Sequence, residues 1–400
     1  MVKYRNRKEA DALRDFIREL KSFFRKGDMV LLILCLATSA FGCLIIASVT
    51  NAPKFGSSTR YIIIQIGATL IGILLFAIMS SIDADTFSEH RLWLTVMCLG
   101  ILAMLIPFGT DNNTGNRSWL DFPFLPFMIQ PAEICKILYI LVTASIMASH
   151  QNRASHIFSV GHIVLYLVLV VGTNMVLSSD LGVSLIFVFI FVGMAFAGGI
   201  NLIWFALAIG AVVAAAPFIW NNFFSDEQRN RILYIFIPQV IDPEGLDEGW
   251  HPSQSLKSLT GGGLTGQGLF NGNRTQGGDL FAQHTDYIFS SIGEELGFIG
   301  CVLVIGLLLL IIIRCIRVGT QSPDYMRRLI CFGAASALIF QVIFNVGMCI
   351  GVMPVIGLTL PLFSYGGSSI VTTYAMLGLV SGVHARPAPR SHERYIRPPL

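Results

Sequence analysis

The stretch MVLLILCLATSAFGCLIIASV, residues 29–49, decides the fold class of this 400-residue chain. It has no charged side chain, and it is as long as the roughly 20 residues that a helix needs to cross the hydrocarbon of a bilayer. Over the whole chain, 54% of the residues are hydrophobic and 13% are charged, whereas a soluble domain is roughly a quarter charged. Most of the chain is therefore expected to lie in a membrane.

Nine more apolar runs follow this first one. The last of them is weaker, but it lies between a turn-rich segment and a basic one. The ten runs cover residues 29–49, 61–81, 92–108, 129–148, 160–177, 181–197, 202–220, 298–313, 329–352 and 368–383. We therefore predict an all-α polytopic membrane domain of about ten transmembrane helices over residues 29–385.

The distribution of Lys and Arg predicts the orientation of this domain, because cytoplasmic segments carry the excess. With the N-terminus inside, the inner segments hold 19 of these residues and the outer segments hold 7. Both termini are therefore expected in the cytoplasm. Residues 1–28 are basic and place Leu13, Phe16 and Leu20 on one helical face, which is typical of an amphipathic helix on the inner leaflet. A solvated tail is the alternative, and residues 386–400 form a second basic tail.

One long polar segment, residues 221–285, interrupts the pattern of short connections and is placed outside by this topology. Long loops without their own structure are uncommon unless they are functional or disordered, and this one contains several aromatic residues, so we expect an ordered loop on the rim of the bundle. Its Gly-rich part, residues 261–268, formally contains GxGxxG. No βαβ unit surrounds it and it faces outward, so a close backbone approach is favoured over a nucleotide site.

The fourth run opens with Gln130-Pro131-Ala132-Glu133 and continues to Lys136. Charged residues at membrane depth are costly and often functional. Glu133 and Lys136 are three residues apart, hence on one helical face, where they can pair with each other and help helices pack. The functional interpretation has Lys136 facing a cavity near the outer surface, where it binds an anionic lipid head. The residues alone leave both interpretations open.

Two further polar positions lie at the outer face. Arg117 precedes Trp119 in an outer loop, where its guanidinium is suited either to a phosphate or to anchoring the loop at headgroup level. Asp180 immediately precedes the sixth run, where helix capping alone is a sufficient explanation. A role for Asp180 in the site is the alternative.

The long loop ends in His284-Thr285-Asp286, at the predicted mouth of the bundle. A partly buried carboxylate there has the raised pKa that a general base near neutral pH requires. Asp286 could instead hold a divalent cation against a diphosphate, or simply cap the next helix. His284 is interpreted as a structural neighbour. Nearby, residues 357–369 combine Pro and Gly at membrane depth and are expected to re-enter the bundle and shape the site.

Together these motifs resemble the SEDS family, the RodA, FtsW and SpoVE proteins of bacterial cell-wall synthesis, and RodA most. The resemblance runs from about residue 29 to 385 and depends on five ordered strings. They are Arg117-Ser118-Trp119-Leu120, Gln130-Pro131-Ala132-Glu133 with Lys136, Gln254-Ser255, His284-Thr285-Asp286 with Glu294-Glu295-Leu296-Gly297, and residues 361–369. One departure is Ser178-Ser179 before Asp180, where the family typically has Gln-Pro, which puts the role of Asp180 in doubt.

The resemblance implies a ten-helix peptidoglycan glycosyltransferase of the bacterial cytoplasmic membrane, with one large extracytoplasmic loop. Such an enzyme polymerises lipid II in cell elongation or division, beside a class B penicillin-binding protein. It also implies that Asp286 is catalytic. The residues expected to bind substrate are Arg117, Trp119, Glu133, Lys136, Asp180, Gln254, Ser255 and His284. A divalent cation, Mg²⁺ or Mn²⁺, is an optional cofactor at Asp286.

Two other functions compete with this one. A lipid II flippase would use Glu133, Lys136 and Asp180 to line a path across the membrane, and it needs polar groups from both faces. A non-catalytic scaffold would only recruit the penicillin-binding protein. No motif for a nucleotide, haem or nucleic acid is present in the sequence.

Overall fold

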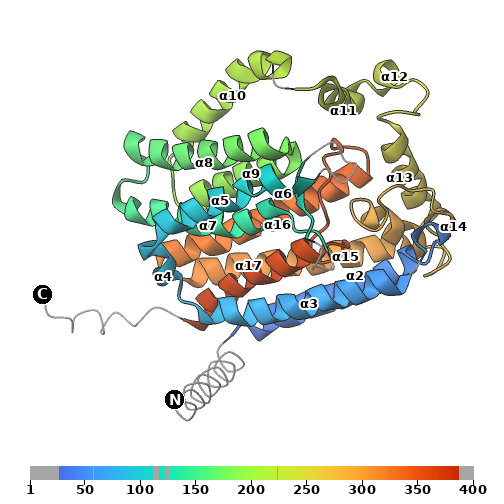
Figure 1. Cartoon of the computed structure of the whole chain (residues 1–400), viewed down its shortest axis with the longest axis horizontal. Coiled ribbons are helices and arrows are strands. Elements are labelled where there is room, and N and C mark those ends of the chain that lie inside the picture. Colours follow the sequence, from blue (N-terminus) through green and yellow to red (C-terminus); the bar gives the residue numbers. More distant parts are fainter. Residues whose placement is uncertain (1–26, 57, 111–116, 123–126, 223, 387–400) are drawn as a thin grey trace, which may run out of the picture.

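The computed structural model describes residues 27–56, 58–110, 117–122, 127–222 and 224–386. Its helices and strands, coloured along the chain in Figure 1, have the following bounds. They are α2 (Met29–Val49), η1 (Pro53–Phe55), α3 (Ser58–Ser81), α4 (Ala84–Glu89), α5 (Arg91–Ala103), α6 (Leu105–Phe108), β1 (Gly109–Thr110), β2 (Trp119–Leu120), α7 (Pro131–Ser149), η2 (Gln151–Arg153), α8 (Ile157–Ser178), α9 (Leu181–Ala197), α10 (Leu202–Asn222), α11 (Asp226–Phe236), α12 (Pro238–Ile241), α13 (Trp250–Gly261), α14 (Asn273–Gly277), α15 (Ile288–Gln321), α16 (Tyr325–Cys349) and α17 (Gly367–Ala385). The predicted basic tails lie outside the described residues, apart from positions 27, 28 and 386.

The fold is all-α, as predicted, and it is that of a multi-pass membrane protein. Eight spans are long and apolar enough to cross a membrane, with α5 and α6 counted together, and α9 is a shorter apolar helix. α17, the run that was weakest in the sequence, is a 19-residue helix that is less apolar than these spans, and as a mostly buried helix packed along α3 it takes the place of the tenth predicted span. The Asp28 backbone N–H donates to the Ser381 hydroxyl at 3.0 Å, so the first and last spans meet at the same end of the bundle. We call this the inner end and the opposite one the outer end.

The helices that hold the core are α7, α16 and α17, which lie in the middle of the bundle in Figure 1. Nearly every residue of α7 is buried, because α5, α8, α16 and α17 surround it. α17 packs along α3 at two glycines, where a Cβ on Gly72 would lie 2.8 Å from the Tyr374 ring and one on Gly378 would lie 2.6 Å from the Phe76 carbonyl. Without a hydrophobic driving force between helices in lipid, such small residues permit the close approach that dispersion requires.

The helix α10 departs from this compact arrangement. It follows α9 after a short turn, yet none of its residues is buried, and it extends away from the bundle in Figure 1. At its start the Trp204 indole donates to the Ser155 carbonyl at 2.9 Å, which holds only this end. The short turn after α9 fixes the position at which α10 begins. The direction of α10 depends on contacts along the helix, and these are few.

The large outer loop packs on the bundle only in part: α13 and α14 do so, as predicted, whereas α11 and α12 have no buried residue. Its Gly-rich part inserts into a kink of α15 at Gly297, whose φ of 67° is not helical. There the Gln267 and Gly268 N–H groups donate to the Glu294 and Glu295 carbonyls, at 3.0 and 2.9 Å. A Cβ on Gly262 would lie 1.9 Å from the Gly293 carbonyl, so the glycine run serves close backbone approach, as predicted.

The kink changes one boundary that the hydropathy pattern had suggested. The apolar run begins near residue 298, but α15 begins ten residues earlier, at Ile288. The additional turns contain four buried polar residues, Ser290, Ser291, Glu294 and Glu295, and the two glutamates bind α14 and α2. The Glu294 carboxylate accepts the Thr275 N–H at 3.0 Å, and the Glu295 carboxylate accepts the Ser48 hydroxyl at 2.7 Å. A buried helical segment with these polar residues thus precedes the apolar segment of α15, and the two meet at the Gly297 kink.

The last outer segment re-enters the bundle, as predicted. Leu362 and Phe363 are buried against α2, where a Cβ on Gly42 would lie 2.7 Å from the Leu362 carbonyl. The Gln65 amide of α3 donates to the Ser364 carbonyl at 3.1 Å. Backbone polar groups at this depth therefore find partners within the protein, which irregular structure in a membrane requires.

Candidate functional site

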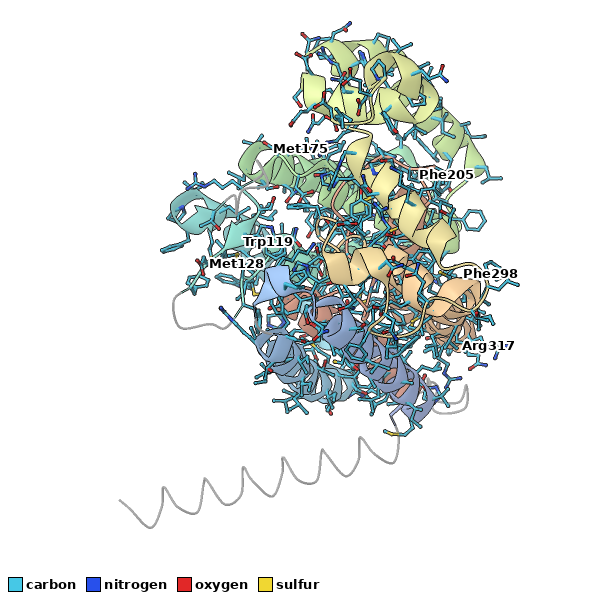
Figure 2. The ribbon with its side chains drawn as sticks, turned by 90° about the vertical axis from the view of Figure 1, so that its right-hand side faces the viewer. Trp119, Met128, Met175, Phe205, Phe298 and Arg317 are labelled. Carbon is cyan, nitrogen blue, oxygen red and sulfur yellow. The ribbon has the colours of Figure 1, made fainter. Side chains whose placement is uncertain are left out.

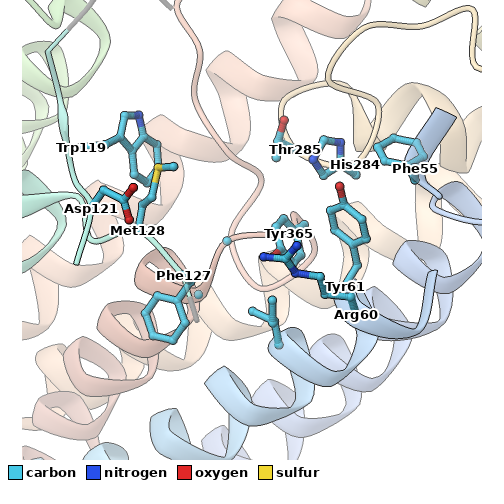
Figure 3. A pocket seen from close by; sticks show the side chains of 13 residues that line it. Phe55, Arg60, Tyr61, Trp119, Asp121, Phe127, Met128, His284, Thr285 and Tyr365 are labelled. Atoms are coloured by element: carbon cyan, nitrogen blue, oxygen red, sulfur yellow. The ribbon is translucent and has the colours of Figure 1, made fainter. Parts of the chain in front are cut away.

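A cavity of about 560 Å³ opens at the outer end of the bundle. Segments far apart in the sequence line it: the loop before α3, the β2 hairpin, the starts of α7 and α9, the turn before α15, and residues 356–369. A second cavity of about 630 Å³ adjoins it and shares Trp119, His284 and Tyr365 with it (Figure 3). Figure 2 views this end of the molecule and shows Trp119 and Met128 on the hairpin side.

Asp286 lines the first cavity from the turn that precedes α15. The Asn345 amide of α16 fixes this turn, donating to the Asp286 carbonyl at 2.8 Å and to the Leu358 carbonyl at 2.6 Å. Among the described residues, no side chain or backbone group donates to the Asp286 carboxylate. Its oxygens are therefore free to accept a proton from a ligand in the cavity.

The electrostatic surroundings of Asp286 suit a proton acceptor. Burial raises the pKa of the Asp286 carboxyl to about 6, and the nearby Asp180 charge adds to this shift. A base works best when its pKa lies close to the operating pH, because it is then ionised and still basic enough to take a proton. The geometry and the pKa thus agree with the base predicted from the sequence.

Asp180 lines the same cavity and also caps α9. One carboxylate oxygen accepts the Val183 N–H at 3.0 Å, and the other accepts the Gln130 amide at 3.4 Å. Burial raises the pKa of Asp180, and the hydrogen bonds that it accepts oppose that shift. Both interpretations of Asp180, as a helix cap and as part of the site, are therefore satisfied by its position.

Glu133 and Lys136 form a buried ion pair. The Lys136 ammonium lies 2.8 Å from one Glu133 oxygen, and the Thr372 hydroxyl donates to the other at 2.8 Å. Glu133 reaches the cavity wall, but Lys136 is 2% exposed and does not line the cavity. The expectation that Lys136 faces the cavity is therefore wrong, because its helical neighbour neutralises it inside the bundle.

Trp119 and Arg117 diverge although they are two residues apart. Trp119 lines both cavities from β2, which pairs antiparallel with β1. The Arg117 guanidinium turns the other way, donating to the Gly109 carbonyl at 2.8 Å and to the Ile106 carbonyl at 3.1 Å. Of the two interpretations left open, these contacts favour the loop anchor over the phosphate ligand.

Gln254 and Ser255 also lie away from the cavities. The Arg274 guanidinium donates to the Gln254 side-chain oxygen, which ties α13 to α14. Ser255 is fully buried and donates to the Cys349 carbonyl of α16 at 2.7 Å. Both side chains hold the outer loop on the bundle. In this structure they therefore position the loop that borders the site and do not line the cavity themselves.

His284 stands between the two cavities in a cluster of rings. Its imidazole packs edge-on against Phe55 and Tyr61, with ring centroids 4.9 and 5.5 Å apart. Burial, together with the nearby Lys54 charge, lowers the pKa of His284 to about 4, so the ring is neutral at physiological pH. This packing agrees with the interpretation of His284 as a structural neighbour rather than a second acid or base.

Several lining residues were not among those predicted from the sequence to bind substrate. They are Lys54, Arg60, Tyr61, Gln130, Gln341 and Tyr365. Gln341 is 1% exposed and its side-chain oxygen has no partner in the described part of the chain. An amide within an apolar run was a usable signal for this residue. Arg60 offered no such signal, because a cation at the start of a span is also what anchors a helix at the interface.

A divalent cation at the site stays a prediction. Within the described ranges, no group of three or more His, Cys, Asp and Glu side chains is arranged to hold a metal ion. Asp286 and Asp180 nevertheless line one cavity, and carboxylate together with phosphate oxygens are the ligands that Mg²⁺ uses when substrate completes its shell.

Comparison with known proteins gives a consistent result along nearly the whole chain. The sequence-family model of the FtsW/RodA/SpoVE cell cycle proteins matches residues 28–388 of this chain. Peptidoglycan glycosyltransferase MrdB of Escherichia coli K12 is 30% identical over 368 residues, which are 91% of this chain and 95% of that protein. The probable peptidoglycan glycosyltransferase FtsW of Trichlorobacter lovleyi is 30% identical over 366 residues, 90% and 93% of the two chains.

Solved structures resemble the chain equally well. One chain from a peptidoglycan synthase complex that coordinates polymerization and crosslinking is 30% identical and aligns with a TM-score of 0.73, covering 93% of this chain and 99% of that chain. Rod shape determining protein RodA of Thermus thermophilus is 28% identical and aligns with a TM-score of 0.66, covering 91% and 98%.

Proposed function

The chain belongs to the FtsW/RodA/SpoVE family of cell cycle proteins, and from this membership we propose how it works as a peptidoglycan glycosyltransferase. Its substrate is lipid II, whose disaccharide enters the outer-end cavity while the polyprenyl chain stays in the bilayer. The observation that carries this proposal is the Asp286 carboxylate, which lines that cavity and accepts no hydrogen bond from the residues that the structure describes.

The reaction follows from this geometry. Asp286 takes the proton of the acceptor 4-hydroxyl as that oxygen attacks the anomeric carbon of the donor. The new glycosidic C–O bond forms while the bond from the anomeric carbon to the diphosphate breaks, and undecaprenyl diphosphate leaves with the electron pair. Both substrates are tethered to the same membrane, so their encounter in one cavity supplies much of the rate through proximity.

Family membership and the charge distribution also support a proposal for the protein's cellular location and its partner. The chain acts in the bacterial cytoplasmic membrane, with both termini in the cytoplasm and the outer end facing the exterior, as the Lys and Arg distribution favours. Its partner is a class B penicillin-binding protein that cross-links the glycan strands. A structural neighbour taken from a peptidoglycan synthase complex supports this part of the proposal.

The decisive experiment is a glycan-chain assay with purified protein, partner and lipid II. Replacing Asp286→Asn keeps the shape of the side chain but removes the base, and the rate is expected to fall about a hundredfold to ten-thousandfold. Lys257→Gln, an exposed change on α13 outside the cavities, is the matched control and should polymerise at the wild-type rate. Near wild-type polymerisation by Asp286→Asn would rule out the base, and no polymer from the wild-type complex would rule out the enzyme.

We also propose that Asp286 and Asp180, together with phosphate oxygens of the substrate, would hold a divalent cation, which would supply positive charge to the leaving diphosphate. Adding a chelator to the same assay should then lower the rate, and Mg²⁺ or Mn²⁺ should restore it. Full activity in excess chelator would show that the chain's own cations suffice.

A further inference from the structure

Among the described residues, the basic side chains at or beside the two outer-end cavities divide into those that already have partners and one that does not. Arg117 donates to two backbone carbonyls, and Lys136 is paired with Glu133. Lys54 lines the first cavity, but its ammonium donates to the Gly278 and Leu280 carbonyls at 2.9 and 2.6 Å. The charged groups of these three cations are engaged in contacts within the protein, so they have few hydrogen-bond donors available for a ligand.

Arg60 is the exception. It lies in the first turn of α3, and Figure 3 shows its guanidinium reaching into the second cavity beside the Tyr365 ring. The guanidinium makes no hydrogen bond or ion pair with any residue that the structure describes. Its charge is nevertheless felt locally: burial raises the pKa of the Tyr365 phenol, and Arg60 acts in the opposite direction.

The wall of this cavity beside Tyr365 adds a second feature that favours anions. The 19-residue helix α17 begins at Gly367, and Gly366 and Gly367 both line the cavity. No side chain caps this helix start, so its N-terminal partial positive charge is left without a carboxylate or hydroxyl partner. A free guanidinium and an uncapped helix start therefore share one cavity, as expected of a phosphate site.

The remaining lining indicates which kind of phosphate fits. Ile64, Phe127 and Met128 form an apolar part of the same cavity, next to the membrane-spanning α3. Trp119, His284 and Thr285 connect it to the cavity that holds Asp286. A ligand that has a sugar at one end, a diphosphate in the middle and a hydrocarbon chain at the other matches this order of surfaces.

We propose that Arg60, with the start of α17, binds the diphosphate of the polyprenyl-linked donor and of the polyprenyl diphosphate that leaves. The assignment depends on the proposed glycosyltransferase function. In this assignment Arg60 takes the place of Arg117 and Lys136, the two cations that the sequence had suggested as ligands of a phosphate or an anionic lipid head. Guanidinium forks bind phosphate oxygens in pairs, so Arg60 stabilises the leaving group as the glycosidic bond forms.

The test measures binding separately from catalysis. Undecaprenyl diphosphate, added to the purified wild-type protein in detergent, should raise its melting temperature, since a ligand that binds only the folded state stabilises it. Arg60→Gln should weaken this binding about tenfold or more, as expected for the loss of a charge-assisted hydrogen bond. Arg60→Lys keeps the charge without the fork and should give an intermediate affinity. Lys257→Gln removes one outer cation outside the cavities and should bind as the wild type does.

Two further ligands distinguish the possible sources of phosphate. Undecaprenyl monophosphate should bind more weakly than the diphosphate, and phosphatidylglycerol vesicles should give no shift that depends on Arg60. Equal binding of the diphosphate by wild type and Arg60→Gln would overturn the proposal. So would equal Arg60-dependent shifts with phosphatidylglycerol, which would make the site one for lipid headgroups in general.

In the polymerisation assay, Arg60→Gln should raise the KM for lipid II and lower kcat, with an unchanged melting temperature of the free protein. A wild-type protein that binds the diphosphate but makes no polymer would contradict the proposed function while leaving the diphosphate site in place. Polymerisation by the wild type with no loss in Arg60→Gln would contradict only the site.

Discussion

The two ends of the bundle treat charge in opposite ways. At the inner end, Arg314 lies 2.7 Å from the Asp28 carboxylate and Arg327 lies 3.1 Å from Asp83. Arg386 donates to the Ile82 carbonyl at 2.6 Å, and the pocket beside it measures about 10 Å³. At the outer end, Asp286 and Arg60 line cavities of several hundred Å³ without internal partners among the described residues.

This difference indicates which end of the bundle can bind and convert a substrate. Paired charges beside a closed pocket stabilise packing, whereas unpaired charges beside an open cavity are available to a ligand. A flippase needs a polar route that reaches both faces, whereas the two cavities of several hundred Å³ described above both open at the outer end. The contrast therefore favours a transferase that works at one membrane face over a transporter.

The largest effect on stability is expected at the one outer pair that resembles the inner ones. Glu133→Ala leaves the Lys136 ammonium buried without its partner, and the free energy of unfolding should fall by about 3–5 kcal/mol. Reversible unfolding in mixed micelles measures this change. Asp226→Asn, in a pair whose aspartate is 93% exposed, is the control and should have little effect. An equally small loss for Glu133→Ala would show that this pair is not structural.

A smaller effect is expected at the inner end. Arg314→Gln leaves the fully buried Asp28 carboxylate without its cation, which should lower the free energy of unfolding by about 1–3 kcal/mol. The rate of lipid II polymerisation per folded molecule should stay at the wild-type value. A fall in that rate at constant folded fraction would break the comparison, because it would link the inner end to catalysis.

The smallest effect is a shift in pH dependence. Asp286 must be ionised to act as a base, so activity should rise with pH through its pKa of about 6. Burial is the larger cause of that raised pKa and the Asp180 charge the smaller one, so Asp180→Asn should move the acidic limb to lower pH by less than burial has raised it. Asparagine also caps helices, so α9 should remain intact. If the acidic limb of the pH–rate profile stays at the same pH in Asp180→Asn, the Asp180 charge does not affect the pKa of Asp286.

Some of the site was predictable before any coordinates. Asp286 was identified from its place after the long loop and from the resemblance of its flanking motif, and the Gly-rich run was assigned to close backbone approach. Gln254, Ser255 and Arg117 were also predicted to bind substrate, but they contact backbone and side chains that hold the outer loop or the end of α6. A motif locates a residue along the chain without saying which way its side chain turns.

The sequence by itself determined the membrane domain and the order of its spans, and it predicts the face on which the site lies. These follow from local composition, because a bilayer imposes a fixed length of apolar residues on every crossing and leaves Lys and Arg on one side. Only the tertiary structure decided which charges are free. The Glu133–Lys136 pair is local, but it is buried because α17 covers that face of α7, where Thr372 contacts Glu133 from 239 positions away. Arg60 stays free because segments far apart in the chain form an open cavity around it.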